Sequence, residues 1–332
     1  MDIVLLILGL VILGKGADVF VLAAARLAVT LRLSAVVVGA VVVGFGTGAP
    51  ELLVSSVAAA RGSLDIAAGN IVGSNLANLT LVLGVAGLIA RPDTVPRVVR
   101  REAPLCFTAV VLFALLLQGG LSRWEGAVLL GSLAVAVVLM LRATEAAPDL
   151  DGEKDDESAM TAFVKELEDF VEGADEEDLG DVAATSARPD VVRVTLGLIA
   201  TVTGAQLLVA GAQGIATDAG LSGGFVGLTI VALGTSLPEL VTAVQSARRN
   251  ETALLAGSVL GSNVFNSTAV AGAAAVIGPA TITDAGLTVV AATSMVGVAA
   301  LAWLFLGLDG RLRRWEGGVL LGVYAATLAL IR

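Results

Sequence analysis

Ten apolar runs, each about as long as a helix that crosses a lipid bilayer, make up most of this chain of 332 residues. A span needs ~20 consecutive apolar residues, and in lipid a single segment satisfies its backbone hydrogen bonds only as an α-helix. A hydrophobic content of 56% with a charged content of 15% excludes an ordinary soluble domain. We therefore predict an all-α membrane protein with ten transmembrane helices at 2–29, 33–60, 66–90, 102–119, 124–142, 191–216, 222–247, 252–278, 286–307 and 315–331.

The basic residues predict how these helices are oriented. If the loops alternate between the two sides of the membrane, three loop lysines and arginines fall on the side of the N-terminus and sixteen on the other side. Cytoplasmic loops carry the excess of basic residues. We therefore expect a multi-pass protein of the cell membrane with both termini outside. The acid-rich stretch at 143–190 would then be a solvated cytoplasmic loop.

The two halves of the chain repeat each other at an offset of 188 residues. The motif GTGAPE (46–51) returns as GTSLPE (234–239), and GSNLAN (73–78) returns as GSNVFN (261–266). Five helices in each half is an odd number, so the second half enters the membrane upside down. Inverted repeats are typical of secondary transporters, whose sites lie near the bilayer midplane. We divide the chain into a first repeat at 1–142 with its motif at 44–84, a loop at 143–190, and a second repeat at 191–332 with its motif at 232–272.

Each repeat places a glutamate in the middle of an apolar run. Glu51 lies in the predicted second helix and Glu239 in the seventh, and neither has a basic residue three or four positions away. A charge at the centre of a bilayer costs at least ~2.5 kcal/mol and usually marks an ion path. A bound cation or a proton must therefore neutralise each carboxylate.

A proline stands directly before each glutamate. Pro50 and Pro238 have no backbone N–H, so each leaves a carbonyl unpaired four residues earlier and opens its helix. Unpaired carbonyls are tolerated in a membrane only where they face protein or a water-filled cavity. We expect the helices to open near 44–49 and 232–237, beside the two carboxylates.

Further side-chain oxygens repeat at helical spacing around these glutamates. A serine and an asparagine lie four residues apart in each repeat, hence on one helical face, and a threonine lies four residues before each glutamate. Together with two carboxylates and free carbonyls, these groups approach the six to eight oxygen ligands of calcium. The chain has no histidine, so imidazole sites are excluded. The additional candidate ligands are Thr47, Ser74, Asn78, Thr235, Ser262 and Asn266.

Charge balance at such a site predicts an exchange mechanism. Two glutamates are neutralised by one calcium ion or by two sodium ions, and a third sodium ion would leave the loaded site with one positive charge. A site that holds either kind of cation, but not both, exchanges them if only its loaded forms can reorient. Exchange of three sodium ions for one calcium ion would be electrogenic.

The paired motifs resemble a known family. GTGAPE with GNIVGSNLAN, and GTSLPE with GSVLGSNVFN, are similar to the α-1 and α-2 repeats of sodium/calcium exchangers in the calcium/cation antiporter superfamily. The resemblance implies that the two glutamates and the carbonyls of Thr47 and Thr235 hold calcium, while Asn78 and Asn266 line the centre. It implies sodium ligands at Thr47, Glu51, Ser74, Ala232, Thr235, Ser236, Glu239 and Ser262.

The resemblance also implies a motion. In the family, helices 1 and 6 slide across the other helices to give alternating access to the site. The small residues of these helices here fit a loosely held pair of that kind. The glycines concerned are Gly14, Gly16, Gly204 and Gly211.

Two positions depart from the family pattern. Gly48 stands where the family commonly has serine, as the second repeat has at Ser236, so one sodium ligand is missing and the coupling ratio stays open. Asn266 stands where many prokaryotic members have aspartate, so the site carries two acids rather than three. The second departure argues against potassium dependence.

The main alternative is a proton/calcium antiporter that uses the same two glutamates. A passive cation channel would need an open pore, and an enzyme would need a nucleophile or cofactor motif that does not accompany these acids. We therefore expect a transporter and not an enzyme. It would carry Ca²⁺ and Na⁺ in the lipid bilayer as a monomer, without a cofactor and without nucleic acid.

Overall fold

Helical backbone makes up nearly all of the described chain. The computed structural model describes residues 1–30, 48–90, 98–145, 187–249, 252–308 and 311–331. No strand occurs among these residues, and six of their helical segments are long and apolar enough to cross a membrane. Every predicted span is represented by helix in the described residues, so the prediction of an all-α membrane protein is confirmed.

The helices of the first half follow the predicted spans to within a few residues. The predicted span 66–90 is one continuous helix made of two α-helical parts and a π-helical turn between them. Of the predicted span 33–60, only the second part lies among the described residues. The first-half elements are α1 (Asp2–Thr30), α3 (Ala49–Ala60), α4 (Leu64–Ala77), η1 (Asn78–Val82), α5 (Leu83–Ala90), η2 (Val98–Glu102), α6 (Ala103–Leu116) and α7 (Arg123–Glu145).

The second half has the same order of elements. Its seventh predicted span is broken into shorter helices, and its eighth again contains a π-helical turn. The elements are α9 (Ala187–Ala219), α10 (Gly223–Val226), η4 (Gly227–Val231), α11 (Ala232–Thr235), α12 (Leu237–Arg249), α13 (Thr252–Phe265), η5 (Asn266–Val270), α14 (Ala271–Ile277), η6 (Gly286–Ala291), α15 (Ala292–Leu308) and α16 (Arg314–Ile331).

The internal repeat extends to the irregular parts of the backbone. The π-helical turns η1 and η5 begin at equivalent asparagines, and η2 and η6 also begin at residues related by the sequence offset. In each of the first two turns a threonine hydroxyl donates to the carbonyl four residues earlier, from Thr80 to Leu76 and, at 2.6 Å, from Thr268 to Val264. Side-chain bonds of this kind compete with the regular helix ladder, and π-helical turns are frequent at functional sites.

Close glycine contacts join each repeat to the other. A Cβ atom on Gly84 of α5 would lie 2.9 Å from the carbonyl oxygen of Gly317 on α16, and a Cβ on Gly126 of α7 would lie 2.9 Å from that of Gly272 on α14. Small residues let membrane helices approach to backbone contact. The third helix of each repeat therefore packs against the last helix of the other repeat.

A second close crossing places α4 against the first part of helix 7. A Cβ atom on Gly69 would lie 2.3 Å from the carbonyl oxygen of Gly224, and one on Gly227 would lie 2.4 Å from that of Ile66. Real Cβ atoms do not approach so closely, so both positions require glycine. The crossing brings the polar residues Asn70 and Ser74 of α4 next to Thr235 of α11.

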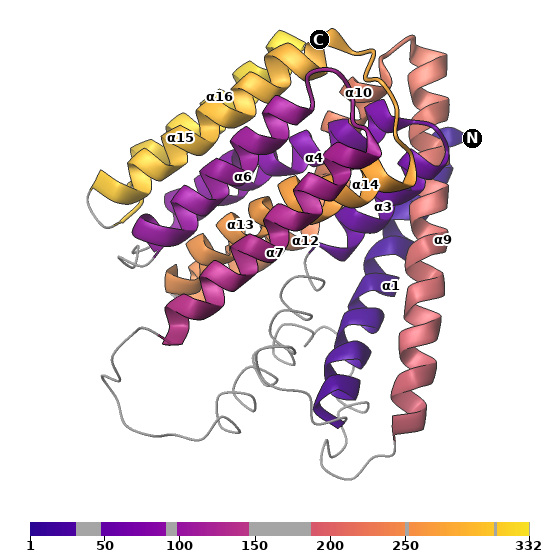
Figure 1. Ribbon diagram of the computed structural model, residues 1–332, viewed down its shortest axis with the longest axis horizontal. Helices are drawn as coiled ribbons and strands as arrows, with labels where there is room; N and C mark the ends of the chain where they lie inside the picture. Colours follow the sequence, from indigo (N-terminus) through magenta and orange to yellow (C-terminus); the bar gives the residue numbers. More distant parts are fainter. Residues whose placement is uncertain (31–47, 91–97, 146–186, 250–251, 309–310, 332) are drawn as a thin grey trace.

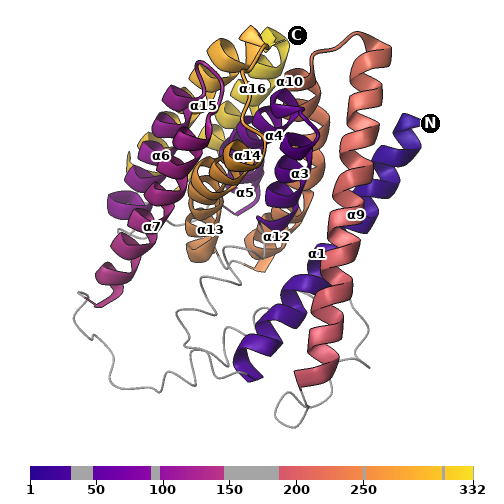
Figure 2. The same ribbon diagram turned by 45° about the vertical axis from the view of Figure 1, so that its right-hand side comes forward.

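The helices α1 and α9 pack along each other at one edge of the molecule (Figures 1 and 2). A Cβ atom on Gly204 would lie 2.3 Å from the backbone nitrogen of Leu13, and a Cβ on Gly16 would lie 2.6 Å from that of Thr201. The expected loosely held pair is therefore closely packed at its own interface. Nε2 of Gln213 on α9 also donates to the hydroxyl of Ser63, in the turn before α4.

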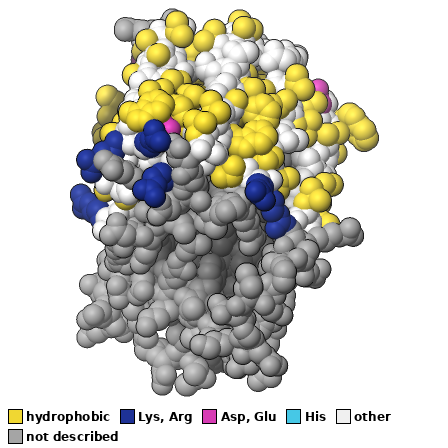
Figure 3. Space-filling view, turned by 90° about the vertical axis from the view of Figure 1, so that its left-hand side faces the viewer, with side chains coloured by type: hydrophobic (Ala, Val, Ile, Leu, Met, Phe, Trp, Pro, Cys, Tyr) yellow, Lys and Arg dark blue, Asp and Glu magenta, His cyan; other side chains and the backbone are white. Residues whose placement is uncertain are grey.

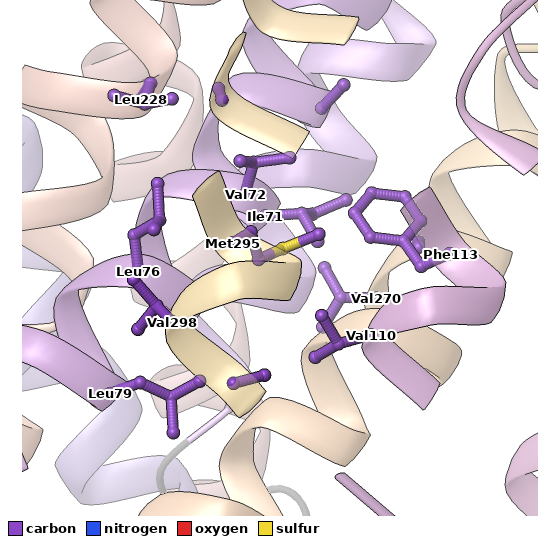
Figure 4. Close-up of a cluster of buried hydrophobic side chains, with 14 of the residues drawn as sticks. Ile71, Val72, Leu76, Leu79, Val110, Phe113, Leu228, Val270, Met295 and Val298 are labelled. Atoms are coloured by element: carbon purple, nitrogen blue, oxygen red, sulfur yellow. The ribbon is translucent and has the colours of Figure 1, made fainter. Parts of the chain in front are cut away.

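The hydrophobic core surrounds α4, which is buried along nearly all of its length. Figure 4 shows Met295 of α15 lying among Ile71 and Leu76 of α4, with Phe113 of α6 and Val270 of η5 on one side. The outer surface is also apolar. Figure 3 shows one face on which hydrophobic side chains cover much of the described surface and basic side chains gather along one border. An apolar belt with a basic border is typical of a protein that sits in a bilayer.

The crossing at Gly69 predicts a sharp difference between two glycine substitutions. Gly69→Ala forces a methyl group against the backbone of α10 and η4, and overpacking of this kind costs about 1–3 kcal/mol. Gly131 on the exposed side of α7 has no described atom within 4 Å of the same position, so Gly131→Ala adds helix propensity without a clash. We expect a lower melting temperature in detergent for the first variant alone. Equal melting temperatures would contradict the crossing.

Candidate cation-binding site

Helix 7 opens just before its proline. The helix α11 ends at Thr235, and α12 begins at Leu237, so Ser236 lies at the break with φ −90° and ψ 6°. Gly48, the equivalent residue in the first repeat, has φ −90° and ψ −1° directly before α3. The opening predicted at 232–237 is therefore present, and the backbone conformation is the same in both repeats. Residues 44–47, including Thr47, lie outside the described residues.

The two glutamates lie one residue past these prolines, in the first turns of α3 and α12. Glu51 is 0% exposed and Glu239 is 9% exposed. Their carboxylates are close enough for their charges to interact, and the hydroxyl of Ser236 donates to Oε1 of Glu51 at 3.3 Å. Glu51 of the first repeat thus contacts the helix break at Ser236 in the second repeat.

Neither carboxylate is fully satisfied by the described part of the protein. Oε2 of Glu51 and Oε2 of Glu239 are buried and accept no hydrogen bond there, and no basic side chain of the described chain neutralises either group. Buried polar atoms are normally hydrogen-bonded, and buried charges are normally paired. These oxygens are therefore available to an ion.

Thr235 gathers neutral oxygens beside the glutamates. Its Oγ1 lies 3.5 Å from Oγ of Ser74 on α4 and 3.3 Å from the carbonyl oxygen of Ala232. The same carbonyl accepts from the backbone N–H of Ser236 at 3.0 Å. The structure therefore brings together five of the residues singled out in the sequence, which are Glu51, Ser74, Ala232, Thr235 and Ser236.

The two candidate asparagines occupy equivalent places. Asn78 and Asn266 are buried and each opens a π-helical turn. Both amide atoms of Asn78 and Oδ1 of Asn266 have no hydrogen-bond partner among the described residues. Such atoms need water or an ion as a partner. Ser262, four residues before Asn266, is also buried on α13.

Three further buried asparagines belong to the same polar interior, and the sequence analysis did not select them. Asn70 donates to Ser55 at 3.0 Å and accepts from Thr235 at 3.2 Å, while Asn75 donates to Ser267 at 2.9 Å. Asn263, the equivalent of Asn75, is fully buried with both amide atoms unpartnered in the described chain. A signal for Asn70 was present, because it lies four residues before Ser74 on the same helical face.

The chemistry of this interior suits hard cations. Its groups are carboxylate, hydroxyl, amide and carbonyl oxygens, which sodium and calcium accept and soft metals do not. No cluster of three or more acids, histidines or cysteines occurs among the described residues. Two negative charges and a larger number of neutral oxygens therefore define the site.

A family model described as "Sodium/calcium exchanger protein" matches residues 1–142 and 190–331. The chain belongs to the sodium/calcium exchanger family. It is 30% identical over 349 residues to the sodium/calcium exchanger MaX1 of Methanosarcina acetivorans, with 99% of this chain and 98% of that protein covered. It is also 35% identical over 282 residues to the inner membrane protein YrbG of Escherichia coli, with 84% of this chain and 80% of that protein covered.

The solved structures of the family support the same arrangement of helices. The sodium-calcium exchanger NCX_Mj, soaked with 2.5 mM Na⁺ and 0.1 mM Ca²⁺, matches with a TM-score of 0.62 and 27% identity. The match covers 100% of this chain and 98% of that one. The resemblance stated from the motifs is therefore confirmed, as is the fold of ten helices in two inverted five-helix repeats, for which the described residues represent every span.

Neutralising either glutamate should remove calcium binding without unfolding the exchanger. Calcium at about 100 times its dissociation constant stabilises a folded protein by about 2.7 kcal/mol, which raises the melting temperature. We expect Glu51→Gln and Glu239→Gln to fold but to lose this calcium-dependent rise. Glu125→Gln is the matched control, because Glu125 accepts from the backbone N–H of Ser122 at 2.6 Å, at the start of α7. A full calcium response in either site variant would contradict the assignment.

Proposed function

We propose that this protein is a sodium/calcium antiporter that works by alternating access. The observation that carries the proposal is the pair of buried carboxylates, one from each repeat, with no basic partner in the described chain. Burial of two unpaired charges in a membrane is very costly unless cations accompany them. The site is therefore stable when loaded, and ion loading becomes a condition for reorientation.

The neutral oxygens favour sodium over the proton as the counter-ion. A proton needs only a carboxylate oxygen, whereas a dehydrated sodium ion needs several further oxygens around it. Ser74, Thr235 and Ser236 supply hydroxyls within reach of each other or of Glu51. The name of the relative MaX1 as a sodium/calcium exchanger supports the same choice.

We propose one set of ligands for calcium and an overlapping set for sodium. Calcium is held by the carboxylates of Glu51 and Glu239 and by the carbonyls of Thr47 and Thr235. Sodium shares the two carboxylates, and Asn78 and Asn266 line the centre. The proposed sodium ligands are Thr47, Glu51, Ser74, Ala232, Thr235, Ser236, Glu239 and Ser262. With three sodium ions for one calcium ion, transport is electrogenic.

We propose that α1 and α9 move as one unit across the other helices. Their glycine contacts make a close mutual interface, which supports movement together. On the side of the core, the hydrogen bond from Gln213 to Ser63 must break and reform as α9 slides. Alternating access of this kind is a rigid-body movement of one bundle around a fixed site.

The placement in the membrane and the division of the chain remain part of the proposal. The excess of basic residues on one side supports external termini and a cytoplasmic loop at 143–190, between repeats at 1–142 and 191–332. The protein is proposed to act as a monomer in the cell membrane. It is proposed to need no cofactor, to bind no nucleic acid and to catalyse no covalent reaction.

Calcium uptake into proteoliposomes tests the proposal against proton exchange. Vesicles loaded with sodium and diluted into sodium-free buffer should take up calcium, and a protonophore should not lower the rate. An inside-positive potential should increase the rate, because three sodium ions leave for each calcium ion that enters. Uptake that ignores the sodium gradient and fails with the protonophore would instead support a proton/calcium antiporter.

The residue at the helix break should tune the response to sodium. Gly48→Ser adds to the first repeat the hydroxyl that the second repeat has at Ser236, at a backbone conformation shared by both. A ligand of this kind contributes about 0.5–1.5 kcal/mol, so we expect the half-saturating sodium concentration to fall by about threefold. The half-saturating calcium concentration should change less.

The reciprocal variant provides the matched control. Ser236→Gly removes the hydroxyl that donates to Glu51 and should raise the half-saturating sodium concentration. For both variants, the half-saturating sodium concentration is measured from initial rates of calcium uptake at varied sodium concentrations. Identical sodium curves for Gly48→Ser and the unmodified protein would contradict a role for this position.

A further inference from the structure

We propose that Asn70 is a positioning residue that sets the sodium affinity of the site by orienting the hydroxyl of Thr235, an inference that rests on the proposed sodium/calcium exchange. Asn70 is fully buried on α4, and its amide connects two other helices. Nδ2 donates to Oγ of Ser55 on α3 at 3.0 Å, and Oδ1 accepts from Oγ1 of Thr235 on α11 at 3.2 Å. One side chain thus joins the two helical segments that bracket the site.

The direction of the Thr235 hydrogen decides what its oxygen can bind. A hydroxyl has one hydrogen to donate and two lone pairs that accept. Ser236 already donates to the carboxylate of Glu51, and the Thr235 hydroxyl is close enough to do the same. A hydroxyl that donates to the carboxylate occupies a position that a cation needs. Donation to Asn70 turns the hydrogen away and leaves the oxygen free to accept a cation.

The amide of Asn70 has a hydrogen-bond partner at each end. Its NH₂ group is occupied by Ser55, which lies four residues after Glu51 on the same face of α3. In this orientation the carbonyl oxygen points towards Thr235, where it can only accept a hydrogen bond. The position of the acid and the orientation of the hydroxyl are therefore set by one connected network.

The residues of this network are not repeated in the second half of the sequence. The offset of 188 residues places Ser258 at the position of Asn70 and Ala243 at the position of Ser55. The second repeat therefore has no amide side chain at the position of Asn70 and no hydroxyl at the position of Ser55. Asn70 and Ser55 are therefore features of the first repeat, and they act on the threonine of the second repeat, Thr235.

The two transported ions should respond differently to the loss of this network. Under the proposed function, calcium uses the backbone carbonyl of Thr235, which α11 positions, whereas sodium uses its hydroxyl as well. Without Asn70, the hydroxyl loses its shorter hydrogen bond and is left with the carbonyl of Ala232 and with Glu51 as acceptors. The sodium site then has a less well oriented ligand. The calcium site keeps its carbonyl and its carboxylates.

Calcium binding to the purified protein, with sodium as the competitor, tests the inference. We expect Asn70→Leu to raise the sodium concentration that displaces half of the calcium by about three- to tenfold, the effect of one hydrogen bond of about 1 kcal/mol. The calcium dissociation constant without sodium should change by less than twofold. Asn70→Ser, which copies the second repeat, should act in the same direction and covers the case in which the leucine variant fails to fold.

A double-mutant cycle with Thr235→Val separates positioning from general packing. Thr235→Val removes the hydroxyl and keeps the carbonyl, so Asn70→Leu should have no further effect on sodium competition in that background. Equal shifts for both ions, or additive effects in the cycle, would overturn the role of Asn70. Calcium binding that ignores sodium in the unmodified protein would overturn the proposed exchange together with this inference.

Discussion

Two carboxylates that no basic side chain of the described protein neutralises set the terms for the rest of the structure. The two negative charges repel each other, and burial makes each charge costly. The two repeats nevertheless bring the carboxylates together in an apolar interior. The arrangement is stable only with positive charge between them. A cation could be held there by neutral oxygens. These come from the helix break at Ser236, from the hydroxyls beside it and from the buried asparagines.

The broad features of the fold could be predicted because they depend on local sequence. Apolar runs predicted the spans, and Pro238 predicted the opening of helix 7, since a missing N–H acts on its own turn. The glutamates could be predicted as a pair because the motif occurs twice. The place of Thr47 stays a prediction, since that residue lies outside the described chain.

Other features depend on contacts between distant residues and were missed for that reason. The π-helical turn at Asn78 has no distinctive pattern in the sequence, and its threonine bond is visible only in the structure. The bridge from Ser55 through Asn70 to Thr235 joins three helices, so spacing along one helix cannot reveal it. The close packing of α1 on α9 likewise depends on contacts between residues far apart in the sequence.

The repeats share a backbone but differ in the side chains that it presents. Both helix breaks have the same conformation, yet one carries Gly48 and the other Ser236. Asn70 and Ser258 differ in the same way. A duplicated backbone supplies two acids at once, while substitutions in one copy change the side chains around them. The symmetry thus belongs to the scaffold, and the proposed control of sodium affinity lies at positions where the symmetry is broken.

The glycine contacts between α5 and α16 and between α7 and α14 bear on how the two halves of the protein depend on each other. The groove that receives α5 of the first half is supplied by α16 of the second half. A first half without the second would leave the glycines of α5 uncovered and Glu51 without the opposing acid. These contacts therefore hold the two halves to each other, and a first half on its own would carry only one of the two acids.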